Sequence, residues 1–277
     1  MTMHLQQIHR YPLKSALGET LQSVEVSPGG VAGDRVFALL DRVTGRVVSA
    51  KRPKLWRSML QLSAATLPGG SEIEVRFPDG HILHSNEEGL APALEGFLGH
   101  DIEILRRREG DLQLERSRPE DVVAQGLDAD VTMDVNSIGE EAPGGAFQDL
   151  AAVHLMTAAT AHAIAAAAGL SGPEISRYRP NFVIDGGDSA AFAENGWIGR
   201  ELRIGSLRLE ITHPTPRCAI PVLEQGSGCA FQPAVLAAIN QLNRTDAGAF
   251  GVQPCAGAYA RVIAPGIVKT GDFASLV

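Results

Sequence analysis

The first third of the sequence is divided into short stretches by closely spaced turn signals. Turn sequences built on glycine and proline occur at 28–30, 44–45, 68–70 and 79–80. Between them lie the stretches that we expect to be strands, at 22–27, 36–41, 46–50, 58–64 and 72–77. No helical pattern separates them, so the spacing predicts a small barrel or sandwich rather than a parallel sheet with crossover helices.

The remainder of the chain mixes helical and strand patterns. We expect an amphipathic helix at 90–99, a strand at 102–106, helices at 148–169 and 233–243, and strands at 181–185, 201–204, 207–213 and 258–263. The acidic stretch 109–147 contains glycine and proline, and we expect it to be irregular and to hold the domain boundary. The sequence therefore predicts a mainly β chain with some α structure (α+β), with domains at 1–118 and 119–277.

Charge and cysteine content narrow the class of protein. The 277 residues include 32 Asp and Glu against 24 Lys and Arg, and 119–176 contains no Lys or Arg, which disfavours duplex nucleic acid as a partner. Three cysteines cannot form a disulfide framework, which favours a reducing compartment. The apolar run 150–170 contains histidines and threonines, and no signal peptide is recognisable, so we expect a cytoplasmic protein without a membrane segment.

Cys218 is the first candidate reactive residue. It lies in the segment 213–221, where three prolines remove backbone donors, so we expect a stiff loop that cannot continue the preceding strand. Arg217 beside it offers a cation that would stabilise a thiolate, the form that acts as nucleophile or metal ligand. The alternative is a buried and inert cysteine, which residue type alone favours.

Two cationic clusters could bind an anion. Arg179 and Asn181 lead into a strand and share a face of it, so they can contact one ligand together. A guanidinium suits phosphate and planar heterocycles, and an ion pair with the acidic run is the alternative. Lys14 and Ser15 follow a proline, and Arg35 follows a Gly-Asp pair. No Gly-rich nucleotide loop and no CxxC, HExxH or GxSxG motif is present.

Taken in order, five short motifs resemble one known family. They are Tyr-Pro-Leu-Lys-Ser at 11–15, Gly-Asp-Arg at 33–35, Arg-Pro-Asn-Phe at 179–182, Arg-Cys at 217–218 and Gly-Ile-Val-Lys-Thr-Gly-Asp at 266–272. Together they resemble MOSC-domain proteins that carry an N-terminal MOSC β-barrel domain, among them the mitochondrial amidoxime reducing component and bacterial reductases of N-hydroxylated compounds. The resemblance implies an N-terminal β-barrel-like domain at 1–118 and a MOSC β-barrel domain with flanking helices at 119–277.

The resemblance also implies a cofactor and the residues that hold it. The family binds a molybdenum cofactor of the molybdopterin type, and Cys218 matches the cysteine that ligates the metal and is catalytic. The matching cofactor-binding positions are Lys14, Ser15, Arg35, Thr157, Arg179, Asn181, Arg217 and Tyr259. Soft thiolate ligands suit such a metal, and the cationic residues suit the phosphate of the cofactor. The family is also associated with pyridoxal phosphate binding.

The function that the resemblance implies is reduction of N-hydroxylated small molecules such as hydroxylamines and amidoximes. Three cysteines cannot supply both a metal ligand and a four-cysteine iron–sulfur site. We therefore expect a separate electron donor, namely a ferredoxin, cytochrome or flavoprotein reductase, and neither nucleic acid nor membrane as a partner. One alternative that the resemblance implies is a sulfur carrier with a persulfide on Cys218, as in MOSC domains linked to sulfurases. A second is a non-catalytic cofactor-binding module, because at 219–224 the chain lacks the hydroxyl residues usual in the reductases.

Overall fold

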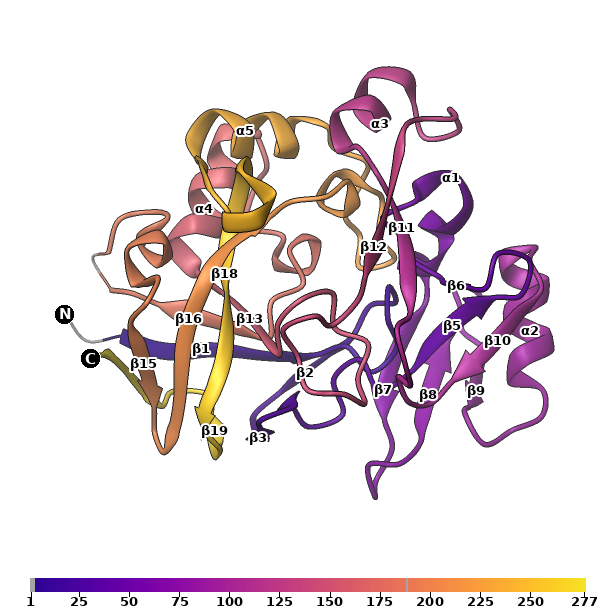
Figure 1. Ribbon diagram of the computed structural model, residues 1–277, viewed down its shortest axis with the longest axis horizontal. Coiled ribbons are helices and arrows are strands. Elements are labelled where there is room, and N and C mark those ends of the chain that lie inside the picture. The colour runs from indigo at the N-terminus through magenta and orange to yellow at the C-terminus, as the bar shows by residue number, and fades with distance from the viewer. Residues whose placement is uncertain (1–2, 188) are drawn as a thin grey trace.

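A closed barrel of seven strands is the main feature of the structure, a computed structural model that describes residues 3–187 and 189–277 (Figure 1). Strands follow one another around the barrel in the order β13, β14, β1, β20, β15, β16 and β18, and β18 pairs with β13 to close the ring. β13 and β14 run parallel, and the other neighbours run antiparallel. The strands are β1 (Met3–Arg10), β13 (Val153–Thr157), β14 (Phe182–Asp185), β15 (Glu201–Ile204), β16 (Leu207–Pro216), β18 (Val252–Ala264) and β20 (Phe273–Leu276).

The barrel interior is filled by aliphatic and aromatic side chains that point inward from every strand. Leu5 and Ile8 of β1 and Ile211 of β16 are fully buried there. Closing the ring leaves no unpaired edge between first and last strand. Two short strands extend the sheet outside the ring: β2 (Glu19–Leu21) pairs with β1, and β17 (Arg244–Asp246) pairs with β18.

A second, smaller unit is formed by residues from Leu13 to Leu105 and has a core of its own around Phe37, Met59 and Leu94. Two three-stranded sheets, β10-β5-β6 and β7-β8-β9, surround this core with helix α2. The elements are β5 (Ala38–Asp41), β6 (Arg46–Val47), α1 (Pro53–Trp56), η1 (Arg57–Gln61), β7 (Ser63–Thr66), β8 (Ile73–Arg76), β9 (Ile82–His84), α2 (Leu90–Leu98) and β10 (Ile102–Leu105). The predicted mainly β chain with some α structure is confirmed.

The two ends of the chain are interleaved. Strand β1 comes from the first ten residues yet belongs to the barrel of the C-terminal part. A third sheet joins β19 (Gly266–Lys269) to β3 (Ser23–Ser27) and β4 (Gly30–Val31). Strand pairing therefore crosses the predicted boundary between residues 118 and 119. The division into domains at 1–118 and 119–277 stays a prediction.

The acidic stretch 109–147 is not irregular, contrary to expectation. It contains the hairpin of β11 (Gln113–Ser117) and β12 (Met133–Ser137), with helix α3 (Pro119–Gln125) between the strands. In Figure 1 this hairpin stands between the barrel and the smaller unit. Glu115 of β11 pairs with Arg46 and Arg52, so basic residues of the first unit compensate part of the acidic charge.

The single long helix predicted at 148–169 is wrong in its first half. Residues 153–157 form strand β13, and only Ala158–Ala167 is helical, as α4. All five residues of β13 are buried, because the strand lies between the barrel interior and the layer of α4. A strand buried on both faces has no alternation, so its apolar run cannot be distinguished from a buried helix. No helix within the described ranges is long and apolar enough to cross a membrane.

The remaining helical elements lie on the barrel side of the chain. Helix α5 (Ala234–Leu242) packs against α4 and β18, close to the predicted 233–243. Single 3-10 turns are η2 (Ile175–Arg177), η3 (Ala193–Trp197), η4 (Ile220–Val222) and η5 (Gly248–Phe250).

Strand β16 continues through residues 213–216, so the expectation that the proline-rich segment 213–221 cannot extend a ladder is wrong for its first four residues. Pro214 pairs with Ala258 and Pro216 with Cys255 on β18, and the register shifts between these prolines. A bulge is where a strand tolerates prolines that cannot donate. The strand therefore ends at Pro216, and Cys218 follows two residues later.

Gly257 on β18 is a position where an added methyl group has no room. Its φ is +84°, and a Cβ there would lie 2.5 Å from His154 Nε2 and 2.6 Å from the Leu155 carbonyl oxygen. We expect Gly257→Ala to lower the free energy of unfolding by about 3 kcal/mol, from backbone strain and overpacking together. Gly228→Ala is the matched control, since Gly228 has φ +90° and open space around it, and it should cost about 1 kcal/mol. Urea denaturation measures both, and equal losses would contradict the steric argument.

Candidate functional site

One cavity brings together eight of the nine residues that the sequence singled out. Its lining comes from the barrel, from the β11–β12 hairpin and from the loops of the smaller unit. The eight are Lys14, Ser15, Arg35, Arg179, Asn181, Arg217, Cys218 and Tyr259. These residues lie up to 245 positions apart in the sequence, from 14 to 259, so the fold alone assembles them.

The backbone around this cavity contains an unusual concentration of left-handed residues. Among the described residues, four that are not glycine have positive φ, and three of these line the cavity: Ser15 at 68°, Arg35 at 52° and Arg179 at 56°. Such conformations cost energy and persist only where the surroundings enforce them, which is common at binding sites. All three carry side chains that could contact an anion.

Cys218 lies at the end of the proline-rich segment, 8% exposed, with its side chain among the residues that line the cavity. Arg217 anchors this segment: its backbone N–H donates to the Pro254 carbonyl, and its guanidinium donates to the carbonyl of Tyr178 at 2.8 Å. The other two cysteines, Cys229 and Cys255, do not line the cavity. Cys218 is thus buried, as the alternative reading supposed, but it borders the cavity.

Arg179 is a buried cation, and no carboxylate among the described residues forms an ion pair with it. Its Nη1 donates to the Ala16 carbonyl at 2.6 Å, and its guanidinium stacks 4.4 Å from the centre of the Tyr11 ring. Burial, followed by the neighbouring Arg35, lowers the pKa of Arg179 to about 10. The sequence left open that Arg179 forms an ion pair with the acidic run. The neighbouring Arg177 forms such a pair, with Glu174.

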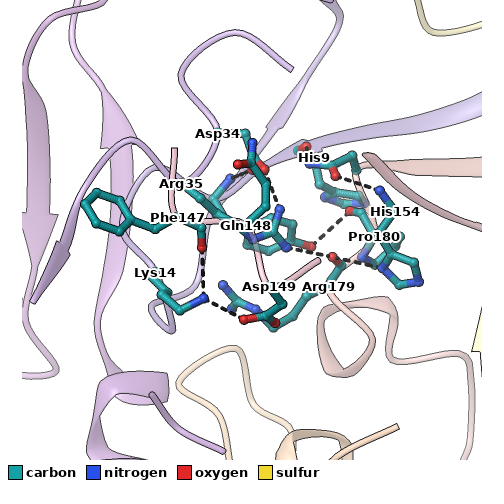
Figure 2. A network of polar contacts seen from close by, with 12 residues as sticks. His9, Lys14, Asp34, Arg35, Phe147, Gln148, Asp149, His154, Arg179 and Pro180 are labelled. Atoms are coloured by element: carbon teal, nitrogen blue, oxygen red, sulfur yellow. Dashed lines mark hydrogen bonds and ion pairs between the residues drawn. The ribbon is translucent and has the colours of Figure 1, made fainter. Parts of the chain in front are cut away.

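Arg35 is held between a carboxylate and a backbone carbonyl. Its Nη1 pairs with Asp34, and its Nη2 donates to the Arg179 carbonyl at 3.3 Å (Figure 2). Asp34 also accepts a hydrogen bond from the Tyr11 backbone N–H at 2.8 Å. These bonds fix Arg35 beside Arg179, so two guanidinium groups face the cavity together.

Lys14 forms a buried ionic cluster with a residue that sequence reasoning missed. Its Nζ donates to Asp149 Oδ1 at 2.6 Å and to the Phe147 carbonyl at 2.8 Å (Figure 2), and Lys51 Nζ lies 3.0 Å from Asp149 Oδ2. Burial lowers the pKa of Lys14 to about 8, although Asp149 opposes this. Burial alone would raise the pKa of Asp149, but the two lysines hold it well below its usual value. Ser15 beside Lys14 accepts a hydrogen bond from the Ala50 N–H at 3.1 Å.

Asn181 connects strands of the barrel next to the cavity through hydrogen bonds to their backbone. Its Oδ1 accepts from the His154 backbone N–H at 3.1 Å, and its Nδ2 donates to the His9 carbonyl at 3.4 Å, so it ties β14 to β13 and β1. Its amide is therefore used mainly by the backbone, which makes it a positioning residue for Arg179.

His154 is a cavity residue that sequence reasoning also missed. Its ring is 6% exposed, and its Nδ1 lies 3.3 Å from the Arg179 carbonyl oxygen. Burial, followed by the neighbouring Arg217, lowers the pKa of His154 well below its usual value, so the ring is neutral at pH 7. The Tyr259 ring lies 5.7 Å from it, and burial raises the pKa of that phenol, which keeps it protonated.

Thr157 is the one predicted site residue that the fold does not bring to the cavity. It is fully buried and caps α4 by accepting a hydrogen bond from the Thr160 N–H at 3.2 Å. Its hydroxyl donates to Glu194 Oε2 at 3.0 Å, and burial raises the pKa of that carboxyl. Thr157 is therefore the residue at which β13 ends and α4 begins, and its hydroxyl caps the helix.

Comparison with protein-family models identifies both halves of the chain. Residues 144–274 match the MOSC domain, and residues 2–92 match the MOSC N-terminal beta barrel domain. The chain belongs to the MOSC-domain proteins with an N-terminal barrel. The MOSC domain is of a type that binds molybdenum cofactor, and MOSC domains are linked to molybdenum-cofactor sulfurase-like and related proteins. Neither family model supports the association with pyridoxal phosphate, and none of the curated proteins matches this MOSC-domain chain.

Solved structures resemble the chain only distantly. The YUAD protein from Bacillus subtilis is 13% identical, with coverage of 100% of this chain and 96% of that chain and a TM-score of 0.48. YiiM from Geobacillus stearothermophilus is 13% identical, with coverage of 52% of this chain and 67% of that chain and a TM-score of 0.33. Likeness at this level carries no argument about the function of this MOSC-domain protein.

The polar atoms of the cavity fit a bound anionic heterocycle. Among the described residues, twelve buried side-chain atoms have no hydrogen-bond partner, and six of these belong to residues that line the cavity. The six are Asn136 Oδ1, Gln148 Oε1, His154 Nε2, Arg179 Nη2, Thr215 Oγ1 and Arg217 Nε. Unpaired buried donors and acceptors are costly, so their gathering at one cavity indicates a ligand that satisfies them. Donors on two arginines match a phosphate, and the mixture of donors and acceptors matches the edge of a pterin.

Proposed function

We propose that this MOSC-domain protein binds a molybdenum cofactor in the cavity and uses it to reduce N-hydroxylated small molecules. The observation that carries the proposal is a single thiol, that of Cys218, at a cavity lined by six cationic side chains. No group of three His, Cys, Asp or Glu among residues 3–187 and 189–277 could hold a metal ion. A metal at Cys218 would therefore have to arrive with ligands of its own, as it does in a molybdopterin complex.

The chain's own residues would bind and orient this group. Lys14, Arg35 and Arg179 offer charged donors to the phosphate, and Cys218 offers one thiolate sulfur to the metal. The bound cofactor would supply the two-electron redox chemistry. His154, neutral at pH 7, also lines this cavity, and its unpartnered Nε2 lies against the backbone of Gly257.

The proposed reaction cleaves an N–O bond. In balanced form, R₂N–OH with two electrons and two protons gives R₂NH and water. The electrons come from a separate donor protein, because the three cysteines of the chain lie apart at 218, 229 and 255 and are too few for a four-cysteine cluster beside the metal ligand. A ferredoxin, a cytochrome or a flavoprotein reductase would serve.

Metal and pterin analysis test the proposal directly. Protein purified from a host that makes molybdenum cofactor should contain close to one molybdenum per chain by inductively coupled plasma mass spectrometry. Acid oxidation should release one fluorescent pterin. With reduced methyl viologen as electron source, the same protein should convert benzamidoxime to benzamidine. Protein with neither molybdenum nor pterin would refute cofactor binding. Loaded protein that reduces no N-hydroxylated compound would refute the reductase activity.

A sulfur-carrier function is the second candidate, and the loop after the cysteine favours it. Ala219 and Val222 are fully buried and Ile220 nearly so, so the residues that follow Cys218 offer no hydroxyl to a substrate. A persulfide on Cys218 would form when its thiolate takes the outer sulfur of a donor protein's persulfide and releases the donor thiol, and this chain would need to supply only the thiol and nearby cations. Intact mass spectrometry of fresh protein distinguishes the candidates: one extra sulfur that a reductant removes, without molybdenum, supports the carrier.

A further inference from the structure

The charges that line the cavity do not balance. Six cationic side chains face it: Lys14, Arg35, Lys51, Arg116, Arg179 and Arg217. Two carboxylates line it, Asp149, which Lys14 and Lys51 share, and Glu140, which is exposed at the rim. Arg35 is paired with Asp34 behind the wall. No ion pair is found within the described ranges for the other three guanidinium groups, which are those of Arg116, Arg179 and Arg217.

Two of these three charges lie deep in the protein. Arg179 and Arg217 are 7% and 6% exposed, and their recorded hydrogen bonds go only to backbone carbonyls. A buried charge without a counter-charge is costly unless a ligand supplies one. The phosphate of a bound cofactor would compensate Arg179, and the thiolate of Cys218 is the anion next to Arg217 in the chain. Arg116 then remains as the cationic side chain with neither an ion pair nor a part of the cofactor assigned to it.

Arg116 has a different position from the buried pair. It lies on β11 and shares the cavity-facing side of that strand with Leu114, while Glu115 points away toward Arg46 and Arg52. Its side chain is partly exposed, which places it nearer the opening than Arg179. Its one recorded hydrogen bond runs from Nη2 to the Arg217 carbonyl at 3.2 Å, so the guanidinium lies beside the residue that precedes Cys218 with most of its donors unused.

We propose that Arg116 binds an anionic group, a carboxylate or phosphate, on the substrate, and that the cavity therefore selects N-hydroxylated compounds that carry such a group. This inference rests on the proposed function for the reaction, and on the position and the unpaired guanidinium of Arg116 for the selectivity. A guanidinium suits a carboxylate because its paired N–H donors match the two oxygens. The anion would be held close to the loop of Cys218, with the N–OH group directed to the reacting centre.

A pair of substrates that differ by one carboxylate tests the selectivity. The loaded protein should show a kcat/KM for 4-carboxybenzamidoxime roughly 10- to 100-fold above that for benzamidoxime, the range expected for one hydrogen-bonded charge pair. Arg116→Gln should reduce this ratio to near one, and Arg116→Lys should keep part of it. Arg118→Gln removes an exposed charge two residues along and should leave the ratio unchanged. The ratio is informative even where Arg116→Gln slows both substrates by disturbing the Cys218 loop.

Binding of compounds that cannot be reduced separates this inference from the reaction. By isothermal titration calorimetry, the wild-type protein should bind 4-carbamoylbenzoate at least 10-fold tighter than benzamide, and Arg116→Gln should lose the difference. If that holds while neither amidoxime is reduced, the reductase proposal fails and the anion site stands. If both amidoximes are reduced equally well, the anion inference is overturned and the reductase stands. Loss of molybdenum or pterin in Arg116→Gln would also overturn it, because the anion bound by Arg116 would then belong to the cofactor.

Discussion

Replacing Cys218 by serine should abolish turnover while the protein still binds pterin. A serine hydroxyl stays neutral near pH 7 and is a hard oxygen ligand, so it cannot replace a soft thiolate at the metal. The cationic residues that would hold the phosphate, Arg35 and Arg179, are not altered. We expect kcat for benzamidoxime to fall more than about 100-fold, since even groups that act only through metal ligands are worth 10- to 100-fold.

The matched control for this variant is Cys229→Ser. Cys229 is also buried, but it does not line the cavity, and its sulfur lies 3.3 Å from the Ser176 hydroxyl and 3.4 Å from the Ser227 hydroxyl, a setting that suits another hydroxyl. This variant should keep kcat within about twofold. Circular dichroism and urea denaturation check that both variants fold. A Cys218→Ser protein that keeps more than a tenth of the wild-type kcat would remove Cys218 from the metal.

Replacing Arg177 by methionine should cause the largest loss of stability. Arg177 is fully buried and pairs with Glu174, and its guanidinium donates to the carbonyls of Pro221 at 3.0 Å, Leu223 at 3.2 Å and Ala230 at 2.8 Å. Methionine fills much of the volume but leaves these carbonyls without a donor. Breaking a buried ion pair and its hydrogen bonds should lower the free energy of unfolding by about 3–5 kcal/mol, measured by urea denaturation.

Arg203→Met is the control for this prediction. Arg203 also pairs with a glutamate, Glu201, but on the surface, where about half of the arginine side chain is exposed and Arg208 shares the partner. Such pairs contribute about 0–1 kcal/mol, so this substitution should be nearly neutral. A loss below about 1 kcal/mol in Arg177→Met would mean that water replaces the guanidinium at all three carbonyls. Because those carbonyls belong to the chain just after Cys218, Arg177→Met should also weaken cofactor retention.

Much of the fold could be predicted from local patterns. Turn signals and alternating strands located β3, β5 and β8 in the first third of the chain, and the helices at 90–99 and 233–243 agree closely with Leu90–Leu98 and Ala234–Leu242. The strand expected at 58–64 is wrong in its first part, where Arg57–Gln61 form the 3-10 turn η1 and β7 begins only at Ser63. Two further failures have one cause in common, which is tertiary context. Strand β13 is buried on both faces and therefore lacks alternation, and β16 accepts Pro214 and Pro216 at bulges that only its partner β18 defines.

The residues of the candidate site also fall into two groups, those that local motifs predict and those that only the tertiary structure reveals. Lys14, Arg35, Arg179, Arg217 and Cys218 could be chosen because each stands in a short motif that also resembles the MOSC family. Lys51, Arg116, Asp149 and His154 could not, because each is a common residue type with no local signal, in a strand, a turn or an apolar run. Thr157 was predicted from the resemblance to the family, and the fold uses it as a helix cap.

The sequence by itself determined the class of fold, the family and the residue types available for chemistry, because turn residues, alternation and short motifs are local properties of the chain. Only the tertiary structure decided which of those residues meet. Closure of the barrel brings β1, β13 and β18 together, and with them Lys14, His154 and Tyr259, from positions far apart in the chain. The ion pairs in the cavity depend on these distances and on burial, which no local pattern contains, so the unpaired guanidinium of Arg116 beside the Cys218 loop became visible only in three dimensions.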